Sequence, residues 1–140
     1  MTSSTMAAFP EPDWFEALRE VVADDAEMAV IGRWCTLDLA IVAGEKTVLL
    51  RLEGGRISGV VPEPDIGVSW HVTLRGTRED WLTFLQPVPP PFYSDLLAMN
   101  SRVPSFSIEG DRGAFVRHLR ALGRVFRIAQ QMSSHAGSRA

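Results

Sequence analysis

The sequence predicts an α+β domain, and three observations carry this prediction. A helix pattern near the N-terminus is followed, between residues 30 and 75, by four consecutive strand patterns separated by turn signals. Two short helix patterns come next. The chain then closes with a fifth strand pattern at residues 105–109 and the longest amphipathic helix pattern of the sequence. This order is typical of a sheet covered by helices.

Period-two alternation of apolar residues defines the expected strands. We expect strands at residues 30–42, 46–53, 56–61, 69–75 and 105–109. Alternation over most of these stretches is the pattern of strands with one buried face. The Gly54-Gly55 pair between the second and third strands is a strong hairpin signal, because glycine tolerates the positive φ that such turns require.

Apolar residues at spacings of three and four define the expected helices. We expect helices at residues 14–26, 78–85, 92–99 and 112–128. Thr77 and Asp111 are expected N-caps of the second and fourth, and either Ser94 or Asp95 caps the third, because their side-chain oxygens can accept hydrogen bonds from first-turn amides. Four prolines between residues 87 and 91 forbid a helix there and predict a stiff, extended segment.

Length and composition predict one domain at residues 13–131, with flexible tails at residues 1–12 and 132–140. A net charge of −3 argues against a dedicated nucleic-acid binder, which carries a large positive excess. No apolar run reaches the roughly 20 residues of a membrane span, and the first twelve residues lack the pattern of a signal peptide. We therefore expect no transmembrane segment and a cytoplasmic location.

The residues also limit the chemistry. A single cysteine, Cys35, excludes an intramolecular disulfide and a cysteine-cluster metal site. No glycine-rich phosphate cradle, nucleophile elbow or zinc-binding helix motif occurs. We therefore expect neither a metal nor a cofactor.

Three stretches of the sequence resemble the sterol carrier protein family of type two. They are the meander at residues 35–61 with its Gly-Gly turn, the strand-to-helix step at residues 74–82, and the strand end at residues 106–111. The resemblance covers residues 14–131. It implies a five-stranded, mostly antiparallel sheet with helices on one face, enclosing an apolar tunnel for fatty acyl chains, sterols or similar ligands.

Two departures from the family pattern leave the identity of the ligand open. The proline run replaces a stretch that the family usually fills with glycine and lysine, and Glu109 stands where the family often carries a basic residue. Both lie near the tunnel mouth that the resemblance implies.

The predicted function is a non-catalytic carrier that holds a hydrophobic ligand and hands it to a partner enzyme. Such a site needs mainly apolar walls, and those expected to form it lie on the helices that face the sheet. They are Trp81, Phe84, Leu85, Phe92, Leu96, Met99, Phe115, Leu119, Leu122 and Phe126. The alternative for each is ordinary core packing, which is the commoner role for any single one.

Two other functions stay open. His71 or His118 could act as an acid or base on a hydrophobic substrate, although a lone histidine on a strand or helix is usually structural. The polar stripe of the last helix could instead dock an acidic partner or anionic lipid headgroups, although such charge rows are usually solvated surface. That stripe consists of Arg117, Arg120, Arg124 and Arg127.

Overall fold

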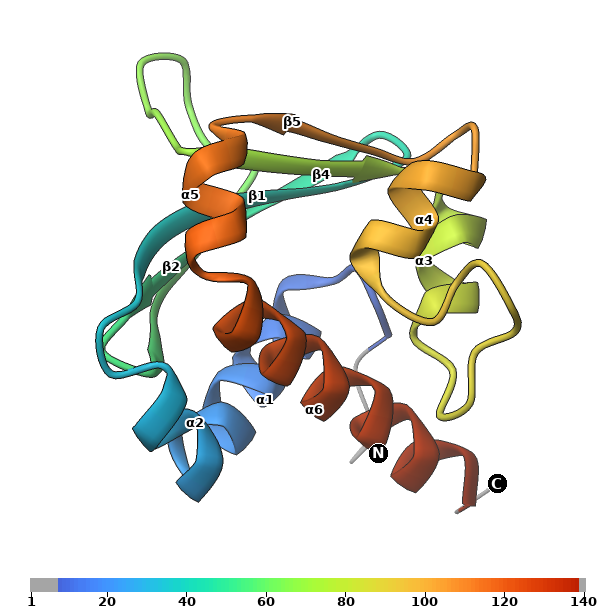
Figure 1. The fold of residues 1–140 in the computed structure, drawn as a ribbon, viewed down its shortest axis with the longest axis horizontal. Helices are drawn as coiled ribbons and strands as arrows, with labels where there is room; N and C mark the ends of the chain where they lie inside the picture. The colour runs from blue at the N-terminus through green and yellow to red at the C-terminus, as the bar shows by residue number, and fades with distance from the viewer. Residues whose placement is uncertain (1–7, 139–140) are drawn as a thin grey trace.

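The computed structural model describes residues 8–138, with side chains described as far as residue 132, and places helices on one face of a single sheet (Figure 1). The elements in chain order are α1 (Pro12–Ala23), α2 (Ala26–Ile31), β1 (Thr36–Ala43), β2 (Lys46–Glu53), β3 (Arg56–Pro62), β4 (Val72–Gly76), α3 (Arg78–Phe84), α4 (Leu96–Arg102), β5 (Ser107–Gly110), α5 (Arg112–Arg117) and α6 (Leu119–Ser138). The predicted α+β class is confirmed.

The sheet has five strands in the order β3-β2-β1-β4-β5. Neighbouring strands run antiparallel except β1 and β4, which are parallel with Leu39 opposite Val72. The prediction of a mostly antiparallel sheet is therefore confirmed, and the sheet is mixed because of that one pair. β1 lies at the centre, and its inward residues Leu37, Leu39 and Ile41 are buried.

Three strand starts differ from the prediction, and one of them is that of β5, which begins at Ser107 rather than at residue 105. The second strand has the predicted bounds, but β1 begins at Thr36, because residues 26–31 form α2. The Asp25 carboxylate caps α2 by accepting a hydrogen bond from the amide of Met28 at 2.8 Å. β4 begins at Val72, three residues after the predicted start at residue 69.

Both long helix patterns are broken in the structure. The predicted helix at residues 14–26 ends at Ala23 as α1, and the Asp25 cap then starts α2, a separate helix that the prediction did not include. The predicted closing helix is two helices. The amide of His118 donates to the carbonyls of Ala114 and Phe115, which ends α5, and α6 begins at Leu119. Apolar spacing continues across both breaks, so periodicity alone did not reveal them.

The expected N-caps are confirmed. Thr77 and Asp80 form a reciprocal capping box at the start of α3. Asp95, rather than Ser94, caps α4 by accepting from the amide of Ala98 at 2.8 Å. Asp111 caps α5 by accepting from the amide of Ala114 at 3.0 Å.

The ordered domain is longer than residues 13–131. Phe9 is buried, and its ring packs edge-on against Trp14 at 5.0 Å between ring centroids. The predicted N-terminal tail is therefore wrong from residue 9 onward, while residues 1–7 lie outside the described residues. At the other end α6 continues to Ser138 and Met132 belongs to the core, whereas residues 139–140 lie outside the described residues.

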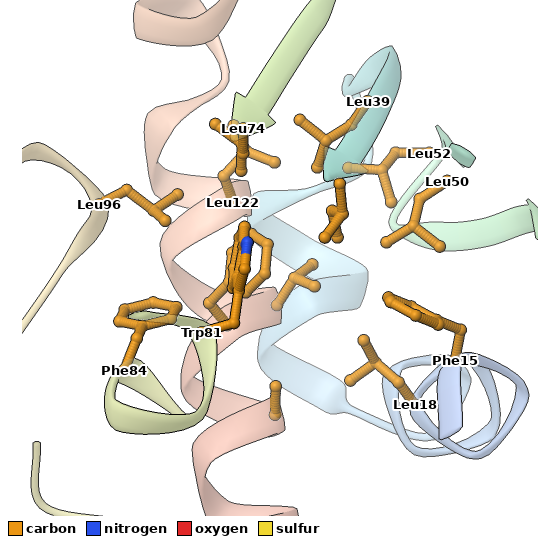
Figure 2. Close-up of a cluster of buried hydrophobic side chains, with 14 of the residues drawn as sticks. Phe15, Leu18, Leu39, Leu50, Leu52, Leu74, Trp81, Phe84, Leu96 and Leu122 are labelled. Atoms are coloured by element: carbon orange, nitrogen blue, oxygen red, sulfur yellow. The ribbon is translucent and has the colours of Figure 1, made fainter. Parts of the chain in front are cut away.

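An aromatic cluster fills the space between the sheet and α6 (Figure 2). Trp81 is fully buried, and its ring lies 5.7–5.9 Å from those of Phe84, Phe106 and Phe126. Such centroid separations are typical of stabilising aromatic pairs. This one side chain joins α3, the residue before β5 and α6.

Arg124 links α6 to α2, which corrects the prediction of a uniformly solvated arginine stripe. Its guanidinium makes two hydrogen bonds to the Asp25 carboxylate, at 2.9 and 2.7 Å, and lies 3.5 Å from Glu27. The side chains of Arg124 and Asp25 are 23% and 15% exposed. This geometry lowers the pKa of Asp25, first through the hydrogen bond from Arg124.

Replacing Asp25 by asparagine tests this link. Asparagine keeps the capping acceptor but removes the charge, so we expect the free energy of unfolding to fall by about 1–2 kcal/mol at neutral pH. Because the pKa of Asp25 is lowered in the folded protein from 3.8, its stabilisation is present above that value and lost as the pH falls through the folded pKa. Urea unfolding of both proteins from pH 7 down to the lowest pH at which they fold would measure the difference. A difference independent of pH would contradict the link.

Candidate ligand-binding site

A hollow of about 260 Å³ lies between the first turn of α4 and the outer side of α6. It is lined by Asp95, Leu96, Leu97, Leu119 and Gly123. Three leucines and a glycine make its wall apolar, and Asp95 provides the carboxylate at its rim. Leu96 is buried and Leu97 is exposed, so the hollow runs from the core to the surface.

A smaller hollow of about 110 Å³ adjoins the first, with which it shares Asp95, Leu96 and Gly123. Its other lining residues are Phe84, Ser94, Phe126, Arg127 and Gln130. Gln130 is buried and donates from Nε2 to the carbonyl of Phe84 at 2.9 Å, which fixes the end of α3 against α6. The two hollows therefore follow α6 past the start of α4.

Gly123 lines both hollows and has no side chain to fill them. A Cβ built at this position meets no atom within 4 Å, so the helix presents bare backbone where a side chain would stand. Glycine inside a helix costs about 1 kcal/mol relative to alanine. Gly123 is exposed and lines both hollows, so a side chain at this position would stand at their shared edge.

A third hollow, of about 250 Å³, also includes Gly123 but is polar. It is lined by Glu27, Ile31, Arg120, Gly123, Arg124 and Arg127. Arg124 is already paired with acidic side chains of α2, so much of the positive charge in this hollow is neutralised within the chain.

The structure separates the predicted wall residues into three groups. Those that line the two apolar hollows are Phe84, Leu96, Leu119 and Phe126. Those buried in the core cluster without lining either hollow are Trp81, Leu85, Met99, Phe115 and Leu122. Phe92 lies elsewhere, half exposed beneath the guanidinium of Arg102.

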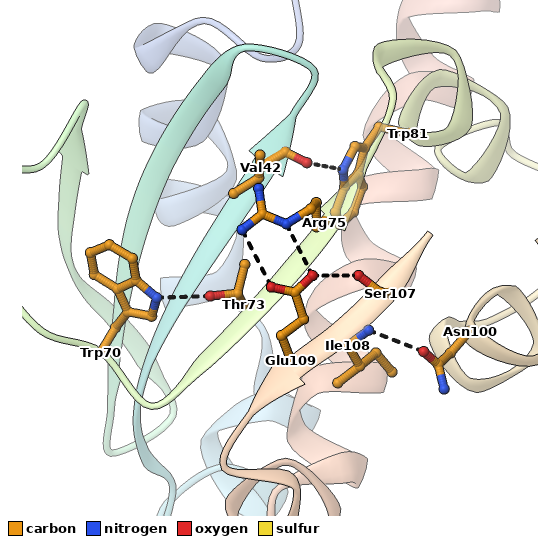
Figure 3. Close-up of polar contacts among 9 residues, drawn as sticks. All are labelled: Val42, Trp70, Thr73, Arg75, Trp81, Asn100, Ser107, Ile108 and Glu109. Carbon is orange, nitrogen blue, oxygen red and sulfur yellow. Dashed lines mark hydrogen bonds and ion pairs between the residues drawn. The ribbon is translucent and has the colours of Figure 1, made fainter. Parts of the chain in front are cut away.

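The buried group holds the walls in place. The indole Nε1 of Trp81 donates to the carbonyl of Val42 at 2.9 Å, which anchors α3 to β1 (Figure 3). Because the aromatic cluster occupies the space between sheet and α6, open space lies beside this cluster, on the α4 side.

Sequence reasoning missed several residues of the hollows. No recognisable binding pattern marked Leu97, Asp95, Ser94 and Gln130, because their role depends on how α4 is placed relative to α6. Gly123 did carry a signal. It is a helix-breaking residue between Leu122 and Arg124, inside the best amphipathic pattern of the chain.

Glu109 belongs to the sheet face opposite the core. Its carboxylate accepts from Arg75 at 3.0 and 3.3 Å and from the hydroxyl of Ser107 at 2.6 Å (Figure 3). The hydrogen bond from Arg75, followed by that from Ser107, lowers the pKa of Glu109. The acidic residue is thus matched by a cation on the neighbouring strand, and it lines none of the hollows described above.

The two candidate catalytic histidines lie at the junction of β4 with α5 and α6. Nδ1 of His71 accepts a hydrogen bond from the backbone amide of Asp38 at 2.9 Å. Burial lowers the pKa of His118 below its ordinary 6.5, and the nearby Arg117 and His71 lower it further. Neither histidine lines the apolar hollows, and no carboxylate hydrogen bond to either is found among the described side chains.

Three further features of the described residues concern metal ligands, the single cysteine and the length of the helices. They contain no group of three or more histidine, cysteine or acidic side chains placed to hold a metal ion. Cys35 is buried, and this burial raises the pKa of its thiol to about 11. Within residues 8–138 no helix combines the length and the apolar character needed to cross a bilayer.

Taken together, the fold and the hollows define a helix-covered, mixed-sheet domain with an apolar recess beside its core. Comparison with solved structures places it more closely: the chain has the fold of sterol carrier protein 2. A crystal structure of sterol carrier protein 2 matches with a TM-score of 0.69 and 14% identity, over 88% of this chain and 98% of that one.

Two solution structures also match this fold. A conserved protein of Thermus thermophilus, described as possibly a sterol carrier protein, has a TM-score of 0.61 and 18% identity over 92% of both chains. The sterol carrier protein domain 2 of Helicoverpa armigera has a TM-score of 0.55 and 17% identity, over 88% of this chain and 95% of that one. No protein-family model and no curated protein matches the sequence. At these identities the likeness establishes the fold.

Proposed function

We propose that this chain is a non-catalytic carrier domain that binds a hydrophobic small molecule, a fatty acyl, sterol-like or polycyclic ligand, and acts in the cytoplasm. The observation that carries the proposal is the apolar recess beside Gly123, which residues of both α4 and α6 line. The sterol carrier fold supports it, because the solved structures with this fold include proteins named as sterol carriers. Fold alone does not define function, so the recess is what makes the proposal specific.

Burial of apolar surface would supply the affinity, at about 25 cal/mol per Å² removed from water. Small-molecule pockets commonly measure about 300–1,000 Å³, so the 260 Å³ recess accommodates part of such a ligand as it stands. Displacement of the first turn of α4 would enlarge it. The far end of α4 is tied to β5, where Asn100 accepts from the amide of Ile108 at 3.0 Å. The first turn, which carries Asp95, makes no such hydrogen bond to the sheet among the described side chains, so the proposal places the opening there.

The polar end of the ligand would lie at the rim of the recess. Ser94, Asp95, Arg127 and Gln130 surround the smaller hollow and offer hydroxyl, carboxylate, guanidinium and amide groups. A few polar groups at the mouth of an apolar pocket fix orientation more than they add affinity. Delivery of the ligand to a partner enzyme is part of the proposal, with the exposed Arg117 and Arg120 as contact candidates for an acidic surface.

Titration of delipidated protein with fluorescent fatty acids, followed by displacement with unlabelled fatty acids, sterols and polycyclic compounds, tests the proposal. Native mass spectrometry of the same samples gives the stoichiometry. We expect one ligand of at least one of these classes to bind per chain. If no compound across the panel binds, the carrier function is wrong.

A further inference from the structure

We infer that the loop between α3 and α4 is a docking surface for a lipid bilayer that contains anionic headgroups. Residues 81–94 contain no charged side chain, although the loop lies on the surface. Val88 is 84% exposed and Phe92 is 51% exposed. Single exposed apolar residues are ordinary, and here two of them lie within one uncharged loop.

The backbone holds Phe92 outward in an uncommon conformation. The amide of Tyr93 donates to the carbonyl of Pro90 at 3.1 Å, and Phe92 has a φ of +76°. Proline followed by a residue of positive φ is the pattern of a type II turn, in which that residue is normally glycine or asparagine. A bulky side chain is rare there. The turn also corrects the prediction of an extended segment, and it argues against a protein that recognises extended polyproline as the occupant.

Two cations lie at the base of the loop. The guanidinium of Arg102 lies 5.3 Å from the centroid of the Phe92 ring, and Nη1 of Arg127 donates to the carbonyl of Pro87 at 3.3 Å. The uncharged stretch is flanked by Asp80 and Asp95. The carboxylates of both residues accept hydrogen bonds from backbone amides at helix starts. Aromatic and aliphatic side chains that enter the interface while arginines reach the phosphates are the pattern of membrane-surface binding.

The loop also adjoins the recess, and this part of the inference rests on the proposed function. Phe84 precedes the loop and Leu96 follows it, and both line the smaller hollow. A bilayer seated on Val88 and Phe92 would therefore lie next to the start of α4, where the proposed function places the opening of the recess. Docking would bring the recess to the source of its ligand.

A second exposed apolar corner provides the matched control. Trp34 is 81% exposed beside α2, with Arg33 stacked 5.4 Å from its ring centroid, and Val30 is also exposed. Its aromatic-arginine chemistry is similar, but neither Trp34 nor Val30 lines the apolar hollows. The two corners therefore differ in position and in charge, because the chain beside the control corner carries Asp24, Asp25 and Glu27.

Co-sedimentation with phosphatidylcholine vesicles, with and without phosphatidylserine, tests the inference. We expect the unmodified chain to bind the anionic vesicles, and the pair Val88→Asp with Phe92→Asp to reduce that binding by about tenfold or more. Phe92→Gly suits the turn and should also weaken binding, which separates loss of the ring from misfolding. The pair Val30→Asp with Trp34→Asp should bind like the unmodified chain.

Several results would overturn docking. They are no binding by the unmodified chain, equal binding by the Val88/Phe92 pair, or loss of binding only in the Val30/Trp34 pair. Sedimentation velocity in which the Val88/Phe92 pair abolishes self-association would assign the loop to a second copy of the chain instead. Ligand titration without vesicles separates the two proposals: docking without ligand binding rejects the carrier function alone, and ligand binding without docking rejects this inference alone.

Discussion

Replacing Trp81 by alanine is expected to lower the free energy of unfolding by about 3–5 kcal/mol, the usual cost of removing a large buried aromatic side chain. Trp81 is fully buried, packs against Phe84, Phe106 and Phe126, and donates to the carbonyl of Val42. Domains have total stabilities of about 5–15 kcal/mol, so this loss is a large fraction of the whole. Urea unfolding at neutral pH measures it.

The same substitution at Trp34 is the control, because that side chain is mostly exposed and its loss should change stability by about 0.5 kcal/mol or less. Trp81→Phe keeps a ring but leaves the carbonyl of Val42 without the indole donor, so an intermediate loss is expected. Equal losses at Trp81 and Trp34 would mean that the aromatic cluster does not hold α3 to the sheet.

Replacing Gly123 by leucine is expected to weaken ligand binding by about tenfold or more while leaving the fold intact. The new side chain would project into space that is open within 4 Å of its Cβ and would occupy the apolar recess. Leucine is also a better helix former, so the stability should be unchanged or higher by up to about 1 kcal/mol. Fluorescent ligand titration and thermal unfolding measure the two effects separately.

Gly113→Leu is the matched control. It makes the same change in the first turn of α5, away from the residues that line the recess. It should leave ligand binding unchanged, with a small stability effect because its Cβ would lie 3.4 Å from the capping oxygen of Asp111. If the Gly123→Leu protein binds ligand as tightly as the unmodified chain, the ligand does not bind in the recess.

Local pattern was enough to predict much of the fold. The turn signals at residues 43–45 and 54–55 predicted both ends of β2, and the caps at Thr77 and Asp111 followed from side-chain chemistry within one turn. The break at His118 was not predictable in this way, because apolar spacing continues through it. Only the packing of α5 against β4 and of α6 against α1 and α2 gives the two helices different directions.

The recess depends still more on tertiary structure. The sequence marked Leu96 and Leu119 as wall residues but gave no sign that they would meet, since more than twenty residues separate them. Gly123 was visible as an irregularity in a helix pattern. Its role as a lining residue depends on the position of α4 across the recess. Contacts with β5 hold α4 in that position, and no local sequence pattern predicts those contacts.

The most direct test of the carrier proposal is methyl NMR of the leucine-labelled protein during titration with the fatty acid, sterol or polycyclic compound that binds most tightly in the fluorescence panel. Binding in the recess predicts that the methyl signals of Leu96, Leu97 and Leu119 shift with saturation at one equivalent. Those of Leu37 and Leu49, on β1 and β2, should stay in place, since neither lines the recess. Saturable shifts confined to other leucines, or no shifts at all, would contradict the proposal.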